Sequence, residues 1–250
     1  MAEDPRYHIR VKPEDVGKYV VVVGDRKRVE RVAKHLKDPV RVGENREYLT
    51  VTGMIKGEKV SVMSTGMGAP AMEIALNELA TTNARVIIRV GTSGALQKNL
   101  KLGESVIAVG TVRRDGVTQQ YLPLEFPAVA DFEVVNYLKK AAEKENHPYH
   151  VGIIYSTDSY YARFFNPDKE KSYIEPLVKA GVLVVEMEVG ALYVVGKVLG
   201  LKTGAILTVR EEISQEGDYI QGGEKYEKGL DKSIIIALKA IEMMIEDGVS

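Results

Sequence analysis

The sequence has neither cysteine nor tryptophan among its 250 residues. Without cysteine, disulfides, thiolate nucleophiles and cysteine-ligated zinc sites are excluded. No apolar run is long enough to cross a bilayer, and the polar start Met1-Ala2-Glu3-Asp4 does not resemble a signal peptide. The 34 lysines and arginines nearly balance the 35 aspartates and glutamates, so no basic stripe predicts a nucleic-acid partner. We therefore expect a soluble, cytoplasmic protein that binds neither nucleic acid nor membranes.

Short apolar, β-branched segments alternate with helical patterns along the chain. Strands are predicted at 19–23, 44–51, 54–63, 85–90, 106–112, 151–155, 182–185 and 203–209, with turns at Gly53 and Gly57. Helices are predicted from Val29, at 71–80, at 131–144, up to Leu199 and at 233–245. This alternation predicts an α/β fold, one domain over residues 1–250, with a parallel or mixed sheet covered on both faces.

Polar segments follow several of these strands. They lie at 24–28, 65–68, 91–94, 156–161 and 186–188. Ligands of such folds bind at the carboxyl ends of strands, so the shared placement of these segments predicts a binding site.

Two of the segments are suited to an oxyanion such as phosphate. Arg89 ends a buried strand and is followed by a glycine turn with the hydroxyl of Thr92. Gly24 precedes Arg26, Lys27 and Arg28 at the start of a helix, where positive charge opposes the helix dipole and therefore needs a reason. The alternative is an ordinary turn with solvated cations.

The carboxylates of Glu186 and Glu188 occupy alternate positions after a run of valines. In an extended segment they would face the same way, and partial burial would require a cationic or hydrogen-bonding partner. The hydroxyls of a sugar diol are one such partner, and acidic residues at a helix N-terminus are the alternative. No Walker or dinucleotide motif is present. From the residues alone, the chain binds a sugar and an oxyanion.

A set of motifs, in order and across nearly the whole chain, resembles the nucleoside phosphorylase-I family of uridine phosphorylases, hexameric purine nucleoside phosphorylases and nucleosidases. The motifs are Tyr7-His8, Val23-Gly24-Asp25 with Arg28, Asn45-Arg46-Glu47, Ser64-Thr65-Gly66-Met67-Gly68, Ile88-Arg89-Val90-Gly91-Thr92-Ser93-Gly94-Ala95, Ala130-Asp131-Phe132, Ser156-Thr157-Asp158 and Val185-Glu186-Met187-Glu188. The resemblance implies a three-layer α/β/α domain whose mixed central sheet is partly barrel-like.

The resemblance also implies residue roles. Phosphate would be bound by Gly24, Arg28, Arg46, Arg89 and Thr92, with Arg46 reaching into the site of a neighbouring subunit. Ribose would contact Glu186, Met187, Glu188 and Thr92, and the His8 of the neighbour would approach its 5′-hydroxyl. No metal or organic cofactor is expected, phosphate is a co-substrate, and the shared sites imply a dimeric unit within a homohexamer.

The segments expected to contact the base resemble two different kinds of enzyme. The run from Tyr121 to Glu133 resembles uridine phosphorylases. Those enzymes bind uracil with a glutamine and an arginine, however, and this sequence has Phe164 and Asn166 in their places. A small shift of the loop would bring Arg163 into that role. Glu211 aligns with the catalytic aspartate of the purine enzymes.

The expected base site accordingly consists of Tyr160, Arg163, Phe164, Val185, Arg210 and Glu211, with Tyr160 stacked on the base. Catalysis would depend on Arg89 and on Glu211, which would protonate or hydrogen-bond a purine ring nitrogen, with Arg210 or Glu212 tuning it. A solvated, charged loop at 210–212 is the alternative.

These inferences predict a uridine phosphorylase-like pentosyltransferase for nucleoside catabolism and salvage, its base left open. It would cleave the N-glycosidic bond of a ribonucleoside with phosphate, releasing the base and ribose 1-phosphate. The alternatives are a purine nucleoside or methylthioadenosine phosphorylase, a hydrolytic nucleosidase and a non-catalytic nucleoside-binding protein.

Overall fold

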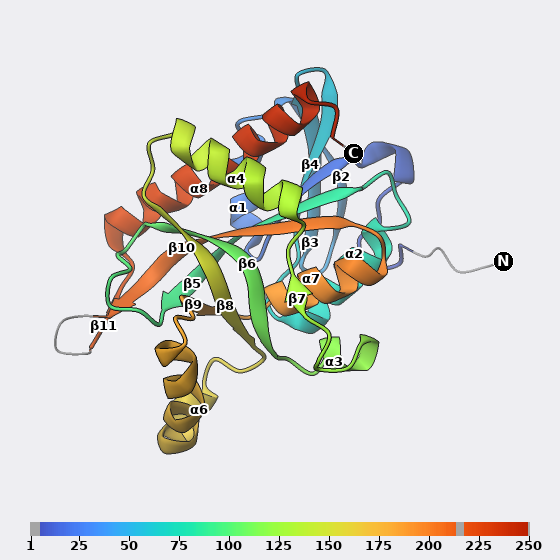
Figure 1. Cartoon of the computed structure of the whole chain (residues 1–250). Coiled ribbons are helices and arrows are strands. Elements are labelled where there is room, and N and C mark those ends of the chain that lie inside the picture. Colours follow the sequence, from blue (N-terminus) through green and yellow to red (C-terminus); the bar gives the residue numbers. More distant parts are fainter. Residues whose placement is uncertain (1–5, 214–217, 250) are drawn as a thin grey trace.

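The computed structural model describes residues 6–213 and 218–249, whose strands form one eleven-stranded sheet flanked by helices (Figure 1). The strands are β1 (Tyr19–Val23), β2 (Lys37–Asn45), β3 (Tyr48–Ile55), β4 (Glu58–Ser64), β5 (Val86–Ala95), β6 (Ser105–Arg114), β7 (Ala128–Val129), β8 (Tyr149–Thr157), β9 (Val184–Glu186), β10 (Lys202–Ile213) and β11 (Tyr219–Gln221). The helices are the 3-10 turn η1 (Pro13–Asp15), α1 (Arg26–Ala33), α2 (Ala69–Leu79), α3 (Thr118–Tyr121), α4 (Phe132–Lys144), α5 (Ala162–Phe165), α6 (Pro167–Lys179), α7 (Val189–Val198) and α8 (Gly223–Glu246).

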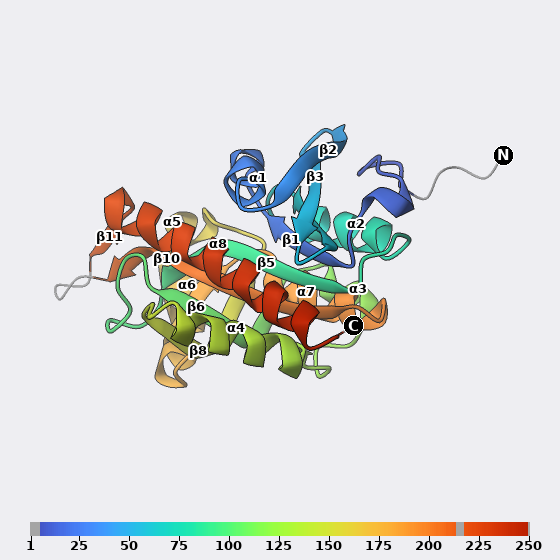
Figure 2. The same cartoon turned by 90° about the horizontal axis from the view of Figure 1, so that it is seen from above.

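Five of the strands close into a barrel. The strand β10 pairs in parallel with β5 and antiparallel with β6, and the path β6-β8-β9-β5 completes the ring. The strands β1, β4, β3 and β2 continue the sheet outward from β5. In Figure 2 this outer part, with α1 beside it, lies to one side of the barrel strands. The mixed, partly barrel-like sheet implied by the resemblance is confirmed.

The strand β1 shows why the sheet needs cover on both faces. Its sequence, Tyr-Val-Val-Val-Val, is buried at all five positions, between the parallel neighbours β4 and β5. One hydrophobic cluster joins the sheet to α2 and α7, and a second joins it to α1, α4 and α8. The helices α4 and α8 pack side by side (Figure 1). Burial on both faces is typical of β-branched strands under two helical layers.

The predicted polar segments meet at one edge of the sheet, but they reach it from strands that run in opposite directions. The strands β1, β4 and β5 are parallel, so their carboxyl ends at Val23, Ser64 and Gly91–Ala95 lie at one edge. The strand β9 runs antiparallel to β5 and parallel to β8. Because β9 runs opposite to β5, its last residue, Glu186, lies beside Arg89 in the middle of β5.

Two turns of the sheet differ from the prediction. The expected strand 44–51 is wrong, because β2 ends at Asn45 and the chain reverses at Arg46, which has a φ of +53°. Gly53 is not a turn but a residue of β3, where an added Cβ would lie 2.7 Å from the Cβ of Leu36. Gly57, with a φ of +85°, does form the predicted turn. Close packing rather than chain reversal explains the glycine at 53.

Several predicted elements have different bounds. The last strand, β10, continues to Ile213, so the alternative of a solvated loop at 210–212 is wrong. The final helix begins at Gly223, ten residues before the predicted start. The helix α6, which projects from the body in Figure 1, was not predicted. Among residues 6–213 and 218–249, no helix is long and apolar enough to span a membrane.

The contact of α8 with the turn before β6 depends on two glycines. An added Cβ on Gly229 would lie 2.1 Å from the carbonyl oxygen of Gly103. We predict that Gly229→Ala lowers the free energy of unfolding by about 1–3 kcal/mol, because this overlap outweighs the better helix propensity of alanine. Urea denaturation measures the change. The control, Lys228→Ala, alters an exposed neighbour on the same helix and should change stability by less than about 0.5 kcal/mol. Equal stability of both variants would contradict the prediction.

Candidate active site

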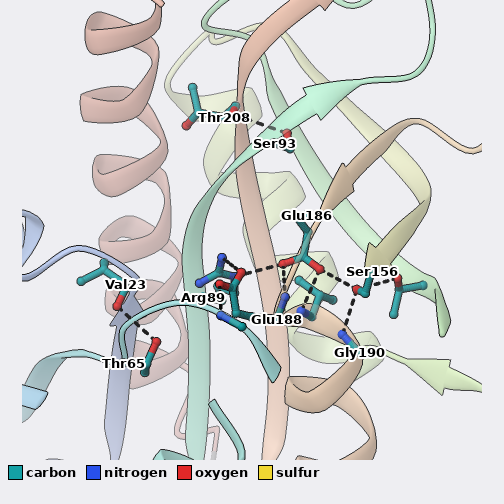
Figure 3. A network of polar contacts seen from close by, with 12 residues as sticks. Val23, Thr65, Arg89, Ser93, Ser156, Glu186, Glu188, Gly190 and Thr208 are labelled. Atoms are coloured by element: carbon teal, nitrogen blue, oxygen red, sulfur yellow. Dashed lines mark hydrogen bonds and ion pairs between the residues drawn. The ribbon is translucent and has the colours of Figure 1, made fainter. Parts of the chain in front are cut away.

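The buried guanidinium of Arg89 lies between two carboxylates. Arg89 comes from β5, is 4% exposed, and its Nη2 donates to Oε2 of Glu188, while Nε lies 3.4 Å from Oε2 of Glu186. Both glutamates are 5% exposed. Figure 3 shows the three side chains pointing toward one another between β5 and the start of α7. The alternative of a solvated arginine is therefore wrong.

The oxygens of Glu186 are occupied by the surrounding protein. Oε1 accepts from Oγ of Ser156 at 2.5 Å and from the backbone N–H of Val189 at 2.9 Å, and Oε2 accepts from the N–H of Glu188 at 2.8 Å. The Ser156 Oγ in turn accepts from the N–H of Gly190 at 3.0 Å. Burial, with the nearby charge of Glu188, raises the pKa of Glu186 to about 7 despite the opposing effect of Arg89. Glu186 thus holds the start of α7 and the guanidinium in place.

Glu188 is turned toward the carboxyl end of β4. Its Oε1 accepts a hydrogen bond of 2.7 Å from the backbone N–H of Gly68, which precedes α2. Gly68 has a φ of +89°, a conformation that residues with a side chain rarely adopt. The predicted glycine turn at 65–68 therefore presents an N–H group to the carboxylate.

A second arginine lies near the first. Arg28, on α1, donates from Nη2 to the hydroxyl of Tyr226 at 3.3 Å. Burial chiefly lowers the pKa of Arg28, and the positive charge of Arg89 acts in the same direction. Among the described residues, Nη1 of Arg89 is buried and has no hydrogen-bond partner. Two neighbouring cations with an unused buried N–H are suited to an anionic ligand.

The other residues predicted for phosphate and ribose lie around this pair. Gly24 follows β1, and its carbonyl accepts from the N–H of Gly66 at 3.1 Å. Thr92 and Met187 are both half-buried, on β5 and just before α7. Arg46 is exposed at the turn between β2 and β3, and its backbone carbonyl accepts from Arg26 at 2.6 Å. Gly24, Thr92 and Met187 border the site. The Arg46 turn lies close to it as well, because the carbonyl of the next residue, Glu47, accepts from Ser64 at 2.6 Å, but the Arg46 side chain is exposed.

A second polar cluster surrounds Glu211, which is 6% exposed. Its Oε1 accepts from the hydroxyl of Tyr160 and from Nε2 of Gln221, both at 2.9 Å. Nη2 of Arg163 lies 3.6 Å from Oε2, and the guanidinium stacks 4.4 Å from the ring centre of Tyr160. Burial and the bond to Glu211 raise the pKa of Tyr160, which keeps its hydroxyl protonated. Tyr160 and Gln221 donate hydrogen bonds to Glu211 and Arg163 forms an ion pair with it, so the cluster holds Glu211 as a hydrogen-bond acceptor.

Of the remaining residues predicted for the base, Phe164 and Val185 lie on the side of the Glu211 cluster, and Arg210 lies on the side of Arg28. Phe164 is 65% exposed and its ring centre is 4.8 Å from the Arg163 guanidinium. Val185 is half-buried beside Gly94. Arg210 is exposed, and its guanidinium carbon lies 6.0 Å from the ring centre of Tyr226, the residue that Arg28 contacts. Arg210 thus lies on the Arg28 side of the site.

Strand register connects the two clusters. Glu211 of β10 pairs with Gly94 of β5, and Gly94 pairs with Val185 of β9. A Cβ on Gly94 would lie 3.4 Å from both Oε2 of Glu211 and a methyl group of Val185. The absence of a side chain at Gly94 leaves this space open. Arg89, Glu188 and Glu211 consequently border one region of the barrel.

Comparison with known proteins assigns the family. Residues 18–242 match the family model of the phosphorylase superfamily. The chain belongs to this superfamily. It is 39% identical over 249 residues to a uridine phosphorylase of Treponema pallidum, covering 97% of this chain and 95% of that protein. It is 36% identical to a uridine phosphorylase of Thermococcus kodakarensis, covering 98% and 88%.

Among solved structures, the purine nucleoside phosphorylase of Toxoplasma gondii in complex with immucillin-H superposes with a TM-score of 0.90. It is 32% identical, and the match covers 99% of both chains. The relatives of this superfamily member thus include uridine and purine enzymes. The predicted resemblance to nucleoside phosphorylases is confirmed, and the conflicting features of the base segments are in keeping with such mixed similarity.

Sequence reasoning missed several groups that shape the site. The motif Ser156-Thr157-Asp158 gives Ser156 no separate role, although its hydroxyl bonds Glu186. Gln221 and Tyr226 were not singled out, because β11 and the first turns of α8 were not predicted. The hydrogen bond from the N–H of Gly68 could not be predicted from residue types, because a backbone group is present at nearly every position. The only available sign was the glycine-rich composition of the 65–68 turn.

The raised pKa of Glu186 predicts a pH-dependent effect on stability. Between its usual value near 4.5 and about 7, the folded protein keeps a proton that the unfolded chain releases. The contribution of Glu186 therefore falls as the pH rises through this window. Relative to Glu186→Gln, the wild type should lose up to roughly 3 kcal/mol between pH 4.5 and 7.5. Chemical denaturation of both proteins measures it, and a pH-independent difference would contradict the assignment.

Proposed function

We propose that the protein is a nucleoside phosphorylase of the uridine phosphorylase type, which cleaves a ribonucleoside with phosphate to free base and ribose 1-phosphate. One observation carries the proposal. A buried, partly unsatisfied Arg89 is bonded to Glu188, so a cation for an oxyanion and a carboxylate for a sugar diol lie side by side. The proposal treats residues 1–250 as one catalytic domain.

Phosphate is held by Arg89 and Arg28, with the backbone at Gly24 and the hydroxyl of Thr92 beside them. The mutual repulsion of the two arginines is relieved when a dianion binds between them. Glu186 holds Arg89 at its Nε edge, so the guanidinium keeps its direction before phosphate arrives. This preorganisation places the nucleophile without further rearrangement.

The ribose lies between phosphate and base, with its 2′- and 3′-hydroxyls on Glu188 and Met187 packed against the sugar. Cleavage of the glycosidic bond develops positive charge on the ribose ring, as in other glycosyl transfers. Bound phosphate and Glu188 stabilise this charge electrostatically. Phosphate oxygen then forms the bond to the anomeric carbon while the bond to the base nitrogen breaks, and that electron pair leaves with the base.

The base is bound by the Glu211 cluster, with Tyr160 and Phe164 as aromatic surfaces and Val185 below. Arg163 donates to base carbonyls and Glu211 accepts from a base N–H, a combination that uracil satisfies. The buried Glu211 also favours a second candidate, a purine nucleoside phosphorylase, in which it bonds the purine ring. As Glu211 is held by donors, we propose hydrogen bonding rather than full proton transfer.

A neighbouring subunit completes the proposed site. Arg46 is exposed at the turn between β2 and β3, and His8 lies at the far end of α2 from Glu188. We propose that each supplies the site of an adjacent copy within a dimeric unit, assembled further into a homohexamer. Phosphate serves as co-substrate, with neither a metal nor an organic cofactor assigned a role, in cytoplasmic nucleoside salvage.

The hydrolytic alternative fits the site less well. A nucleosidase activates water and has no need of two neighbouring arginines. A non-catalytic nucleoside-binding protein has no need of them either, since neutral sugar and base carry no charge that they would neutralise.

The proposal predicts that cleavage depends strictly on phosphate. Release of free base is measured for uridine, inosine, guanosine, adenosine and methylthioadenosine, each with and without phosphate. Uridine should be cleaved only with phosphate present, and cleavage confined to purine nucleosides would support the second candidate. Full turnover in phosphate-free buffer would instead identify a nucleosidase.

The role of Arg28 predicts a selective loss of phosphate affinity. Arg28→Ala should raise the KM for phosphate about tenfold or more, since a charge-assisted bond is removed, while the KM for nucleoside changes little. The matched control is Lys27→Ala, one residue earlier in the same helix, where the side chain is exposed. Phosphate titrations of both variants measure the effect. An equal change in both, or none in Arg28→Ala, would refute this role.

A further inference from the structure

A buried carboxylate outside the Arg89 site holds the segment that contains His8. Glu78, on α2, is 7% exposed. Its Oε2 accepts from the backbone N–H groups of His8 at 2.9 Å and of Ile9 at 2.8 Å. Its Oε1 lies 2.5 Å from Nδ1 of the His8 ring. On the other side, Nδ2 of Asn45 donates to the His8 carbonyl at 2.9 Å. Backbone and ring of His8 are therefore both fixed.

The contact between Glu78 and Nδ1 of His8 determines which ring nitrogen can accept a hydrogen bond from a ligand. An ionised carboxylate has no proton to donate, so the hydrogen between Glu78 and Nδ1 belongs to the imidazole. In the neutral ring, Nε2 is then the acceptor and faces away from Glu78. Backbone anchoring alone would not require this ring contact, because the two N–H groups already satisfy Oε2.

The length of α2 separates His8 from the site of its own chain. The N–H of Gly68, at the start of α2, bonds Glu188, whereas Glu78 lies in the last turn. Ten residues at about 1.5 Å each place Glu78 about 15 Å from Gly68 along the helix. This separation places His8 too far from Glu188 of its own chain to contact a sugar held there.

We infer that Glu78 is a positioning residue, which holds His8 so that Nε2 accepts a hydrogen bond from the 5′-hydroxyl of a nucleoside in the neighbouring subunit. This inference rests on the proposed function, which places His8 near that hydroxyl. Glu78 itself touches no substrate. It acts by fixing the tautomer and direction of the ring, as carboxylates commonly do for functional histidines.

The test compares a nucleoside with its 5′-deoxy analogue at saturating phosphate. The proteins are the full-length wild type, Glu78→Gln, His8→Asn and the double variant. A matched control, Glu73→Gln, makes the same change five residues earlier on α2, where the carboxylate accepts from Asn77 and Tyr121. The glutamine in Glu78→Gln keeps the size of the side chain, but its amide favours the opposite tautomer of His8.

We expect Glu78→Gln to lower kcat/KM about tenfold for the 5′-hydroxyl substrate and less than about twofold for the 5′-deoxy analogue. His8→Asn should show the same selectivity, and the double variant should lose no more than His8→Asn alone. Glu73→Gln should resemble the wild type with both substrates.

Other outcomes separate the failures. Equal losses on both substrates would make Glu78 a structural residue only and overturn the inference. Multiplied losses in the double variant would show that Glu78 does not act through His8. An unaffected His8→Asn would remove His8 from the site, and the inference with it, while leaving phosphorolysis intact. A wild type without phosphate-dependent turnover would overturn the proposed function and the inference together.

Discussion

The buried guanidinium of Arg89 between Glu186 and Glu188 is the interaction on which the rest of the site depends. Two carboxylates and one cation have been removed from water, which is costly unless each group is bonded. Ser156 and the first N–H groups of α7 satisfy Glu186, and the N–H before α2 satisfies Glu188. The starts of two helices are thereby fixed around one arginine, whose Nη1 has no hydrogen-bond partner among residues 6–213 and 218–249.

The closed barrel makes this arrangement possible. The strand β9 enters antiparallel to β5 and delivers Glu186 to the side of Arg89, although the two residues are almost one hundred positions apart. The same closure pairs β10 with β5 and puts Glu211 opposite Gly94. An open parallel sheet would leave these carboxylates at separate places along its edge. Closure therefore joins the proposed phosphate, ribose and base sites into one region.

The helix α2 connects this region with the opposite end of the outer sheet. Its first turn follows the N–H that bonds Glu188, and its last turn carries the glutamate that holds His8. A rigid helix of this length fixes the distance between the two. If His8 serves a neighbouring subunit, as we propose, then α2 sets the spacing between the two active sites.

Sequence alone determined the local character of the chain. The valines of β1 predict a doubly covered strand, and the glycine and arginine segments at 24–28 and 88–95 predict an oxyanion site, because these signals depend on residues close in sequence. The family resemblance depends on the order of motifs along nearly the whole chain. The sequence also predicts Glu186 as a sugar ligand, which stays a prediction, and a turn at Gly53, which is wrong because Gly53 lies within β3.

Only the tertiary structure decided the features that depend on contacts between distant segments. The burial of Glu211, the donors around Glu186, the packing of Gly53 on Leu36 and the bond of Glu78 to His8 all join distant segments. Neither periodicity nor composition encodes which of these segments meet. Strand pairing and barrel closure determine that, and with it which carboxylates are held by the protein and which are left for a substrate.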